Sequence, residues 1–69
     1  MYGALNLIYE VDMFYIVDRD NGRTPVKSGF KTSAQANKWA KKNLPEDDVY
    51  LWGVKQQPKM RRYIVERKL

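Results

Sequence analysis

The fold is decided by one stretch, MFYIVDRDNGRTPVKSGFKTSAQANKWAKKNLP, which spans residues 13–45. It starts with MFYIVD (13–18), an apolar and aromatic run up to Asp18 that predicts a central strand buried on both faces. The polar segment DRDNGRT (18–24) follows, and Asn21-Gly22 tolerates the positive φ angles that a tight hairpin turn demands. We therefore expect a hairpin whose second strand covers about residues 25–30, with proline at its start because proline cannot donate to a strand ladder.

The second half of this stretch predicts one helix over about residues 33–43. Thr32 can cap its start, and Gln35 three residues later fits a capping box. Pro45 ends the helix because proline disfavours helical geometry in the residue before it. Four apolar residues share one face and predict the side that packs on the sheet: Ala36, Trp39, Ala40 and Leu44.

Two more strands are predicted after the helix. VYLWGV (49–54) follows an acidic turn, and MRRYIVER (60–67) follows the loop KQQPK (55–59). An antiparallel sheet of four strands with the helix packed on one face buries these patterns, so the predicted fold class is α+β. The alternation of LNLIYEVD (5–12) adds either a fifth strand or a dispensable extension over residues 1–12. The order is therefore strand–strand–helix–strand–strand, preceded in the five-stranded version by one more strand.

The length of 69 residues predicts a single small domain, residues 1–69, whose core must hold by packing alone. The chain has no Cys and no His, which excludes disulfides, thiolate or imidazole zinc sites and a His general base. Its glycines form no phosphate-binding loop, and the acidic turn Glu46-Asp47-Asp48 lacks the further ligands of a metal site. We therefore expect no enzyme activity, no cofactor and no metal. The lack of an apolar run of about 18 residues predicts a cytoplasmic protein without a membrane span.

The net charge of +5 is confined to one end of the sequence. Seven Lys/Arg and seven Asp/Glu cancel over residues 1–54, whereas residues 55–69 hold six Lys/Arg against Glu66 alone. A local surplus of this kind indicates an interaction surface. The predicted binding residues are the cations Lys55, Lys59, Arg61, Arg62, Arg67 and Lys68 and the aromatic residues Trp52 and Tyr63.

Strand alternation assigns the residues of the last strand to faces. Met60 and Ile64 suit the helix-covered core, which leaves Arg61, Tyr63 and Arg67 for the open face of the sheet. Aromatic rings between cations on an open sheet are typical of a stacking platform with phosphate contacts. The sequence therefore predicts a non-catalytic nucleic-acid binder that contacts RNA or DNA mainly through the backbone and by base stacking. The alternative is an edge strand that its charges protect from pairing with other chains.

Two further partners fit the same residues. The basic strand can dock on an acidic protein surface or add to a partner's sheet, as an inhibitor or regulator of a host enzyme, also within a ribonucleoprotein complex. It can also form a homodimer through residues 60–67 as an edge strand. On the helix, three lysines opposite the apolar face form either a solvated surface or a secondary binding stripe: Lys38, Lys41 and Lys42.

Residues 13–44 combine an aromatic strand, a polar hairpin and Gly-Phe-Lys-Thr before a helix with Ala36 and Trp39 at the A-x-x-W spacing. In these features the segment resembles part of the arm-binding amino-terminal domains of phage-type tyrosine recombinases. In that family a small sheet enters the DNA major groove with the helix behind it, so the resemblance implies DNA binding. The chain departs from the family by two strands after the helix, and no recombinase catalytic residue can be transferred to it. Its size and composition also resemble those of bacteriophage accessory proteins, which often bind a nucleic acid or block a host enzyme.

Overall fold

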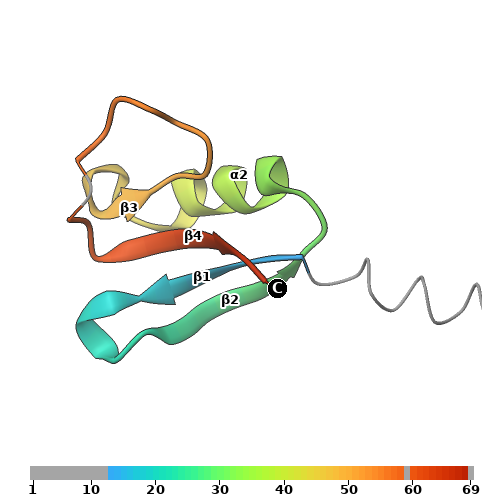
Figure 1. Ribbon diagram of the computed structural model, residues 1–69, viewed down its shortest axis with the longest axis horizontal. Helices are drawn as coiled ribbons and strands as arrows, with labels where there is room; N and C mark the ends of the chain where they lie inside the picture. Colours follow the sequence, from blue (N-terminus) through green and yellow to red (C-terminus); the bar gives the residue numbers. More distant parts are fainter. Residues whose placement is uncertain (1–12, 59, 69) are drawn as a thin grey trace, which may run out of the picture.

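The computed structural model describes residues 13–58 and 60–68, which have the predicted α+β architecture of a four-stranded sheet with one helix packed on one face (Figure 1). The strands are β1 Phe14–Asp18, β2 Thr24–Phe30, β3 Val49–Tyr50 and β4 Tyr63–Arg67. The helix is α2, Ser33–Asn43, and the two short 3₁₀ turns are η1, Arg19–Asn21, and η2, Glu46–Asp48. The fifth strand or extension predicted over residues 1–12 lies outside the described residues.

The strand order in the sheet is β2–β1–β4–β3, so β1 and β4 are its central strands. β1 is antiparallel to both of its neighbours, and Ile16 lies opposite Val65 of β4. β3 is parallel to β4, however, so the prediction of a purely antiparallel sheet was wrong. The reason is the connection over residues 51–62, which leads the chain from the end of β3 back to the end of the sheet at which β3 begins, so that β4 runs in the same direction. Parallel neighbours require such a connection of about a dozen residues.

β4 is a central strand, in contrast to the edge strand that its charges predict as the alternative. It pairs with β1 over its whole length and with β3 at Tyr63 and Ile64. The interpretation of this strand as a charge-protected edge was therefore wrong. The homodimer through an edge strand stays a prediction, but residues 60–67 do not form that edge.

The hairpin between β1 and β2 forms where it was predicted, but its turn is longer than two residues. Asn21 belongs to η1, and the left-handed residues are Gly22 (φ 64°) and Arg23 (φ 60°) instead of Asn21-Gly22. The Asp18 carboxylate accepts a hydrogen bond from the Asp20 backbone N–H at 3.0 Å and so caps the 3₁₀ turn. This cap moves the left-handed pair one residue along the chain.

α2 begins and ends at the predicted residues. The Thr32 hydroxyl accepts a hydrogen bond from the Gln35 N–H at 3.2 Å, and the Gln35 side-chain oxygen accepts one from the Lys31 N–H at 3.0 Å. The second bond reaches one residue further back than in a capping box, so it also fixes the chain between β2 and α2. The helix ends where the backbone becomes extended at Leu44, whose N–H donates to the Ala40 carbonyl at 2.9 Å.

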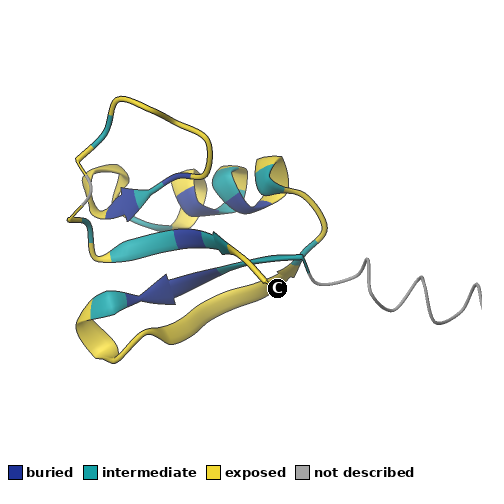
Figure 2. Cartoon of the chain, in the orientation of Figure 1, coloured by how far each residue is buried: buried dark blue, intermediate teal, exposed yellow. Residues whose placement is uncertain are grey.

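The core lies between α2 and the central strands, where Figure 2 shows buried segments on both layers. Ala36 and Ala40 are fully buried and belong to the predicted sheet-facing side of the helix. Full burial of a Val, Leu or Ile side chain contributes about 1.5–3 kcal/mol, so this cluster is the main source of stability. It comprises Ile16, Ala36, Ala40, Val49, Leu51 and Val65, with Phe14, Phe30, Trp39, Leu44 and Tyr63 packed against it.

The face assignment of β4 was wrong by one residue. Val65 is buried in the core and Tyr63 packs against the same cluster, so these residues face α2. Ile64 lies opposite Val17 on the other face of the sheet, and Met60 is 82% exposed. Both faces of this strand mix apolar and charged residues, so the alternation alone did not specify which face is buried.

Candidate functional site

Arg61 stabilises the fold, although it was predicted to extend from the open face of the sheet. Its Nη1 donates to the backbone carbonyl oxygens of Glu46, at 2.8 Å, and of Val49, at 3.2 Å. Its Nε is buried and makes no hydrogen bond within the described residues. The guanidinium therefore joins the segment that precedes β4 to η2 and the start of β3, and a phosphate contact at Arg61 has to compete with this arrangement.

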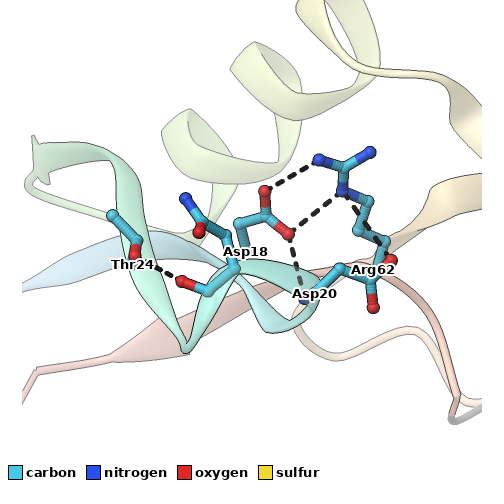
Figure 3. Close-up of polar contacts among 5 residues, drawn as sticks. Asp18, Asp20, Thr24 and Arg62 are labelled. Atoms are coloured by element: carbon cyan, nitrogen blue, oxygen red, sulfur yellow. Dashed lines mark hydrogen bonds and ion pairs between the residues drawn. The ribbon is translucent and has the colours of Figure 1, made fainter.

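Arg62 pairs with Asp18 at the end of β1 (Figure 3). Its Nε and Nη2 lie 3.0 Å from the two carboxylate oxygens of Asp18, and its Nε lies 3.9 Å from the Asp20 carboxylate. The hydrogen bonds from Arg62 hold the pKa of the Asp18 carboxyl below its usual value, and the same contact raises the pKa of Arg62. The positive charge of Arg62 is thus already matched by carboxylates of the chain itself.

Tyr63 does not offer an open stacking surface. Its ring packs against the buried cluster beneath α2, and the Arg62 guanidinium carbon lies 5.1 Å from the ring centroid. A cation at that distance interacts favourably with the ring. Trp52, the other predicted aromatic binding residue, contacts Phe14, with ring centroids 5.2 Å apart and planes at 75°.

The other face of the sheet holds a second ion pair. Glu66 accepts hydrogen bonds from the Arg23 guanidinium and, at 3.3 Å, from the hydroxyl of Tyr15, which lies opposite it on β1. The hydrogen bond and charge of Glu66 raise the pKa of Arg23. The single acidic residue of the carboxy-terminal segment is therefore paired with a cation of the hairpin turn.

Three helix lysines remain available: Lys38, Lys41 and Lys42. All three are exposed, and none forms an ion pair with another described residue. Together with Ala34 and Asn37 they line a shallow hollow of about 490 Å³ on the outer side of α2. The helix contains no acidic residue, so their charges add without local compensation.

Trp52 is joined to this helix by Asn37. The side-chain amide of Asn37 accepts a hydrogen bond from the backbone N–H of Trp52 and donates one to the backbone carbonyl of Trp52, both at 2.9 Å. In the same way Gln57 accepts from the Leu51 N–H, at 3.1 Å, and donates to the Leu51 carbonyl, at 2.8 Å. These two amides take the place of a strand partner for the backbone groups of Leu51 and Trp52, since backbone N–H and C=O groups removed from water need a hydrogen-bond partner. They explain why β3 ends at Tyr50, well before its predicted end.

Arg67 lies next to Trp52. It is opposite Phe14 in the sheet, and Phe14 is the ring that Trp52 contacts. Trp52 is 41% exposed, and both residues line a shallow hollow together with Tyr15 and Glu66. Arg67 forms no ion pair with any residue in the described ranges. We refer to Lys38, Lys41, Lys42, Trp52 and Arg67 as the lysine–tryptophan face.

The predicted binding residues are thus divided between the two ends of β4. Lys55 is exposed in the connection after β3, whereas Lys59 lies outside the described residues. Lys68 follows β4, and its backbone N–H donates to the Met13 carbonyl at 2.6 Å. Sequence reasoning missed Asn37, because an asparagine on a polar helix face gives no signal of the loop that it will bind.

Two classes of site have no counterpart in residues 13–58 and 60–68. Asp, Glu, His and Cys side chains form no group of three or more there that could hold a metal ion. In the same residues, no helix has both the length and the apolar character that crossing a membrane requires.

Comparisons with known proteins gave no match: no family model, no curated protein and no solved structure matches this chain. The resemblance to arm-binding domains therefore stays a prediction. A proposal about function has to rest on the geometry of the chain itself.

Proposed function

We propose that this protein is a small non-catalytic nucleic-acid binder that contacts the phosphodiester backbone through the lysine–tryptophan face. The observation that supports this best is the row of three exposed helix lysines without an acidic partner in the described residues, on the helix to which the backbone of the exposed Trp52 is hydrogen-bonded. Such lysines attract phosphates and release counterions without first breaking an internal ion pair. The indole of Trp52 adds a surface on which bases of any sequence can stack.

The protein binds RNA or DNA with little sequence preference, because contacts to phosphates do not distinguish one base from another. Arg67 and Lys55 are exposed cations outside α2 that add further phosphate contacts. Arg61 and Arg62 add less than their charges indicate, because both are engaged within the fold.

The test measures the salt dependence of binding. Fluorescence anisotropy with a labelled oligonucleotide, between about 50 and 200 mM salt, gives the slope of log K against log salt. The triple variant Lys38→Gln/Lys41→Gln/Lys42→Gln is expected to flatten this slope by about two units, at about 0.7–0.9 per lost phosphate contact. Circular dichroism checks that the variant is folded.

Lys27→Gln is the matched control, because Lys27 is exposed on β2 and is not part of the lysine–tryptophan face. Lys27→Gln is expected to change the salt slope of binding less than Lys41→Gln, a single substitution on the helix. An unchanged slope in the triple variant, or equal retention of the protein on a nucleic acid and on a neutral resin at low salt, contradicts the proposal.

The connection over residues 51–62 favours a second candidate, a protein partner with an acidic surface that the chain inhibits or regulates. Three large apolar side chains are exposed there, namely Trp52 at 41%, Val54 at 42% and Met60 at 82%. Exposed apolar side chains beside cations are typical of protein interfaces more than of phosphate contacts. A complex from cell lysate that survives nuclease, and that Val54→Ser/Met60→Ser abolishes, supports this candidate. A complex that disappears with nuclease supports the nucleic-acid binder.

A further inference from the structure

A cleft beside the lysine row is walled by two aromatic rings. Phe30 is the last residue of β2, and Trp39 lies in the middle of α2, which follows directly (Figure 1). Their ring centroids are 6.1 Å apart and their planes are inclined at 54°. With Gln35, Lys38 and Lys42 the two rings line an open cleft of about 280 Å³.

Helix periodicity explains why these side chains meet. Residues spaced at i, i+3, i+4 and i+7 share one side of a helix, and here they are Gln35, Lys38, Trp39 and Lys42. Long lysine side chains cover apolar surface with their methylene stems and keep their ammonium groups in water. Lys38 and Lys42 form no ion pair within the described residues, and no carboxylate lines the cleft. The cleft is therefore apolar inside and positive at its rim.

We infer that this cleft binds one unpaired nucleobase, with Lys38 and Lys42 at the phosphates on either side of it. This inference rests on the proposed function and adds to it a preference for single-stranded over double-stranded nucleic acid. A base has a flat apolar face that aromatic side chains accept regardless of sequence. Within a duplex that face is covered by the neighbouring base pairs, so only an unstacked base can enter the cleft.

Gln35 supplies a polar group at the same place. Its side-chain oxygen already accepts a hydrogen bond from the Lys31 N–H. Its amide N–H groups have no hydrogen-bond partner within the described residues, although Gln35 lines the cleft. An apolar pocket with one such polar group is typical of sites that orient a small planar ligand.

A larger hollow, which Trp52 helps to line, suits a nucleotide less well. It has a volume of about 510 Å³ and is lined by Tyr50, Ile64 and Glu66, among others. The Glu66 carboxylate, although paired with Arg23, places negative charge at its wall and disfavours an approaching phosphate. The cleft at Phe30 and Trp39 lacks such a charge, which is why we assign the base to it.

The experiment compares three ligands of equal length with the wild-type protein: a short oligothymidylate, an abasic oligomer of deoxyribose phosphates, and a duplex. Stacking of one base on aromatic side chains predicts that oligothymidylate binds at least about fivefold more tightly than the abasic oligomer. The duplex is expected to bind like the abasic oligomer once affinities are compared per phosphate. Equal affinity for the base-containing and abasic oligomers overturns the inference but leaves the proposed function intact. Absence of binding to all three overturns both.

Phe30→Leu tests the cleft itself, with Val26→Ala as a control at an exposed apolar position of the same strand. Phe30→Leu is expected to lose the preference for oligothymidylate while the salt slope remains. If Phe30→Leu does not fold, the Trp39 indole N–H resonance of the wild-type protein decides the question by NMR. It is expected to shift with oligothymidylate and not with the abasic oligomer. A resonance that responds equally to both ligands contradicts a base in the cleft.

Discussion

The two ends of β4 hold the same kind of residue but use it differently. At the start of the strand, Arg61 donates to two backbone carbonyls and Arg62 pairs with Asp18. At the end of the strand, Arg67 forms no ion pair within the described residues and lies beside the exposed ring of Trp52. The difference shows that a local surplus of cations in a sequence is not the same as a surplus on the surface.

The same comparison holds for the acidic residues. Asp18 and Glu66 are paired with Arg62, just before β4, and with Arg23, in the hairpin turn, whereas no carboxylate of the described residues is paired with a lysine of α2. The positive charges of the helix lysines are therefore not neutralised by ion pairs within the described residues. In the sequence, by contrast, the surplus of positive charge lies in the carboxy-terminal segment. The candidate interface moves accordingly, from the last strand to α2 and the two residues beside it.

The largest expected effect comes from Arg61→Met, which keeps the apolar stem and removes the guanidinium. Two charge-assisted hydrogen bonds to the carbonyls of Glu46 and Val49 are lost, and we expect a loss of about 2–4 kcal/mol in the free energy of unfolding. Urea denaturation followed by circular dichroism measures this loss. A change below about 0.5 kcal/mol, the range of an ordinary surface substitution, would show that Arg61 is not engaged as the structure describes.

Asn37→Ala is expected to have an intermediate effect on stability and a direct effect on the lysine–tryptophan face. It removes both hydrogen bonds to the Trp52 backbone, which we expect to lower the free energy of unfolding by about 1–2 kcal/mol. Trp52 then loses its fixed position beside α2, so affinity for an oligonucleotide falls even where the variant is folded. Asn43→Ala is the matched control, because the Asn43 amide donates to the Trp39 carbonyl of its own helix and to no other segment that the structure describes. Equal losses of affinity in both variants contradict the role of Asn37.

The pair of Asp18 and Arg62 predicts a dependence of stability on pH. The pKa of the Asp18 carboxyl is lowered in the folded state, mainly by its hydrogen bonds from Arg62. The pair therefore stabilises the fold fully above the unfolded-state pKa of about 3.9, and this contribution is lost as the pH falls through the lower, folded-state pKa. Thermal unfolding followed at a series of pH values below about 5 measures the loss. Asp18→Asn is expected to unfold at a lower temperature at neutral pH and to show a weaker dependence in this acidic range.

The sequence predicted the elements whose signals are local. Thr32 and Pro45 delimit the helix through capping and through backbone sterics, and these effects do not depend on the rest of the fold. The parallel pairing of β3 with β4 was not predictable in this way, because it depends on the path of the connection after β3 and on contacts between segments far apart in the sequence. The prediction of which β4 side chains face the helix was wrong for a similar reason. Both faces of β4 are amphipathic, and only packing against Ala36 and Ala40 selects the face that is buried.

The candidate site was predictable in its residue types but not in its location. Trp52, Arg67 and the helix lysines were all identified as candidates from charge and aromatic content. Their availability depends on which cations find carboxylates or carbonyls in three dimensions, and those partners are far away in the sequence. Asp18 and Arg62, for example, are joined only because β1 and β4 are neighbours.

The smallest effect on stability is expected for Arg67→Met, and it sharpens the comparison between the ends of β4 most directly. Arg67 is exposed and is unpaired within the described part of the chain, so we expect a change within about 0.5 kcal/mol in the free energy of unfolding. If Arg67 contacts a phosphate, the salt slope of binding falls by about one unit. Arg61→Met, measured at a temperature where it is folded, is expected to leave that slope unchanged. The reverse result, with the slope altered by Arg61→Met and not by Arg67→Met, would place the interface at the start of β4 and contradict the lysine–tryptophan face.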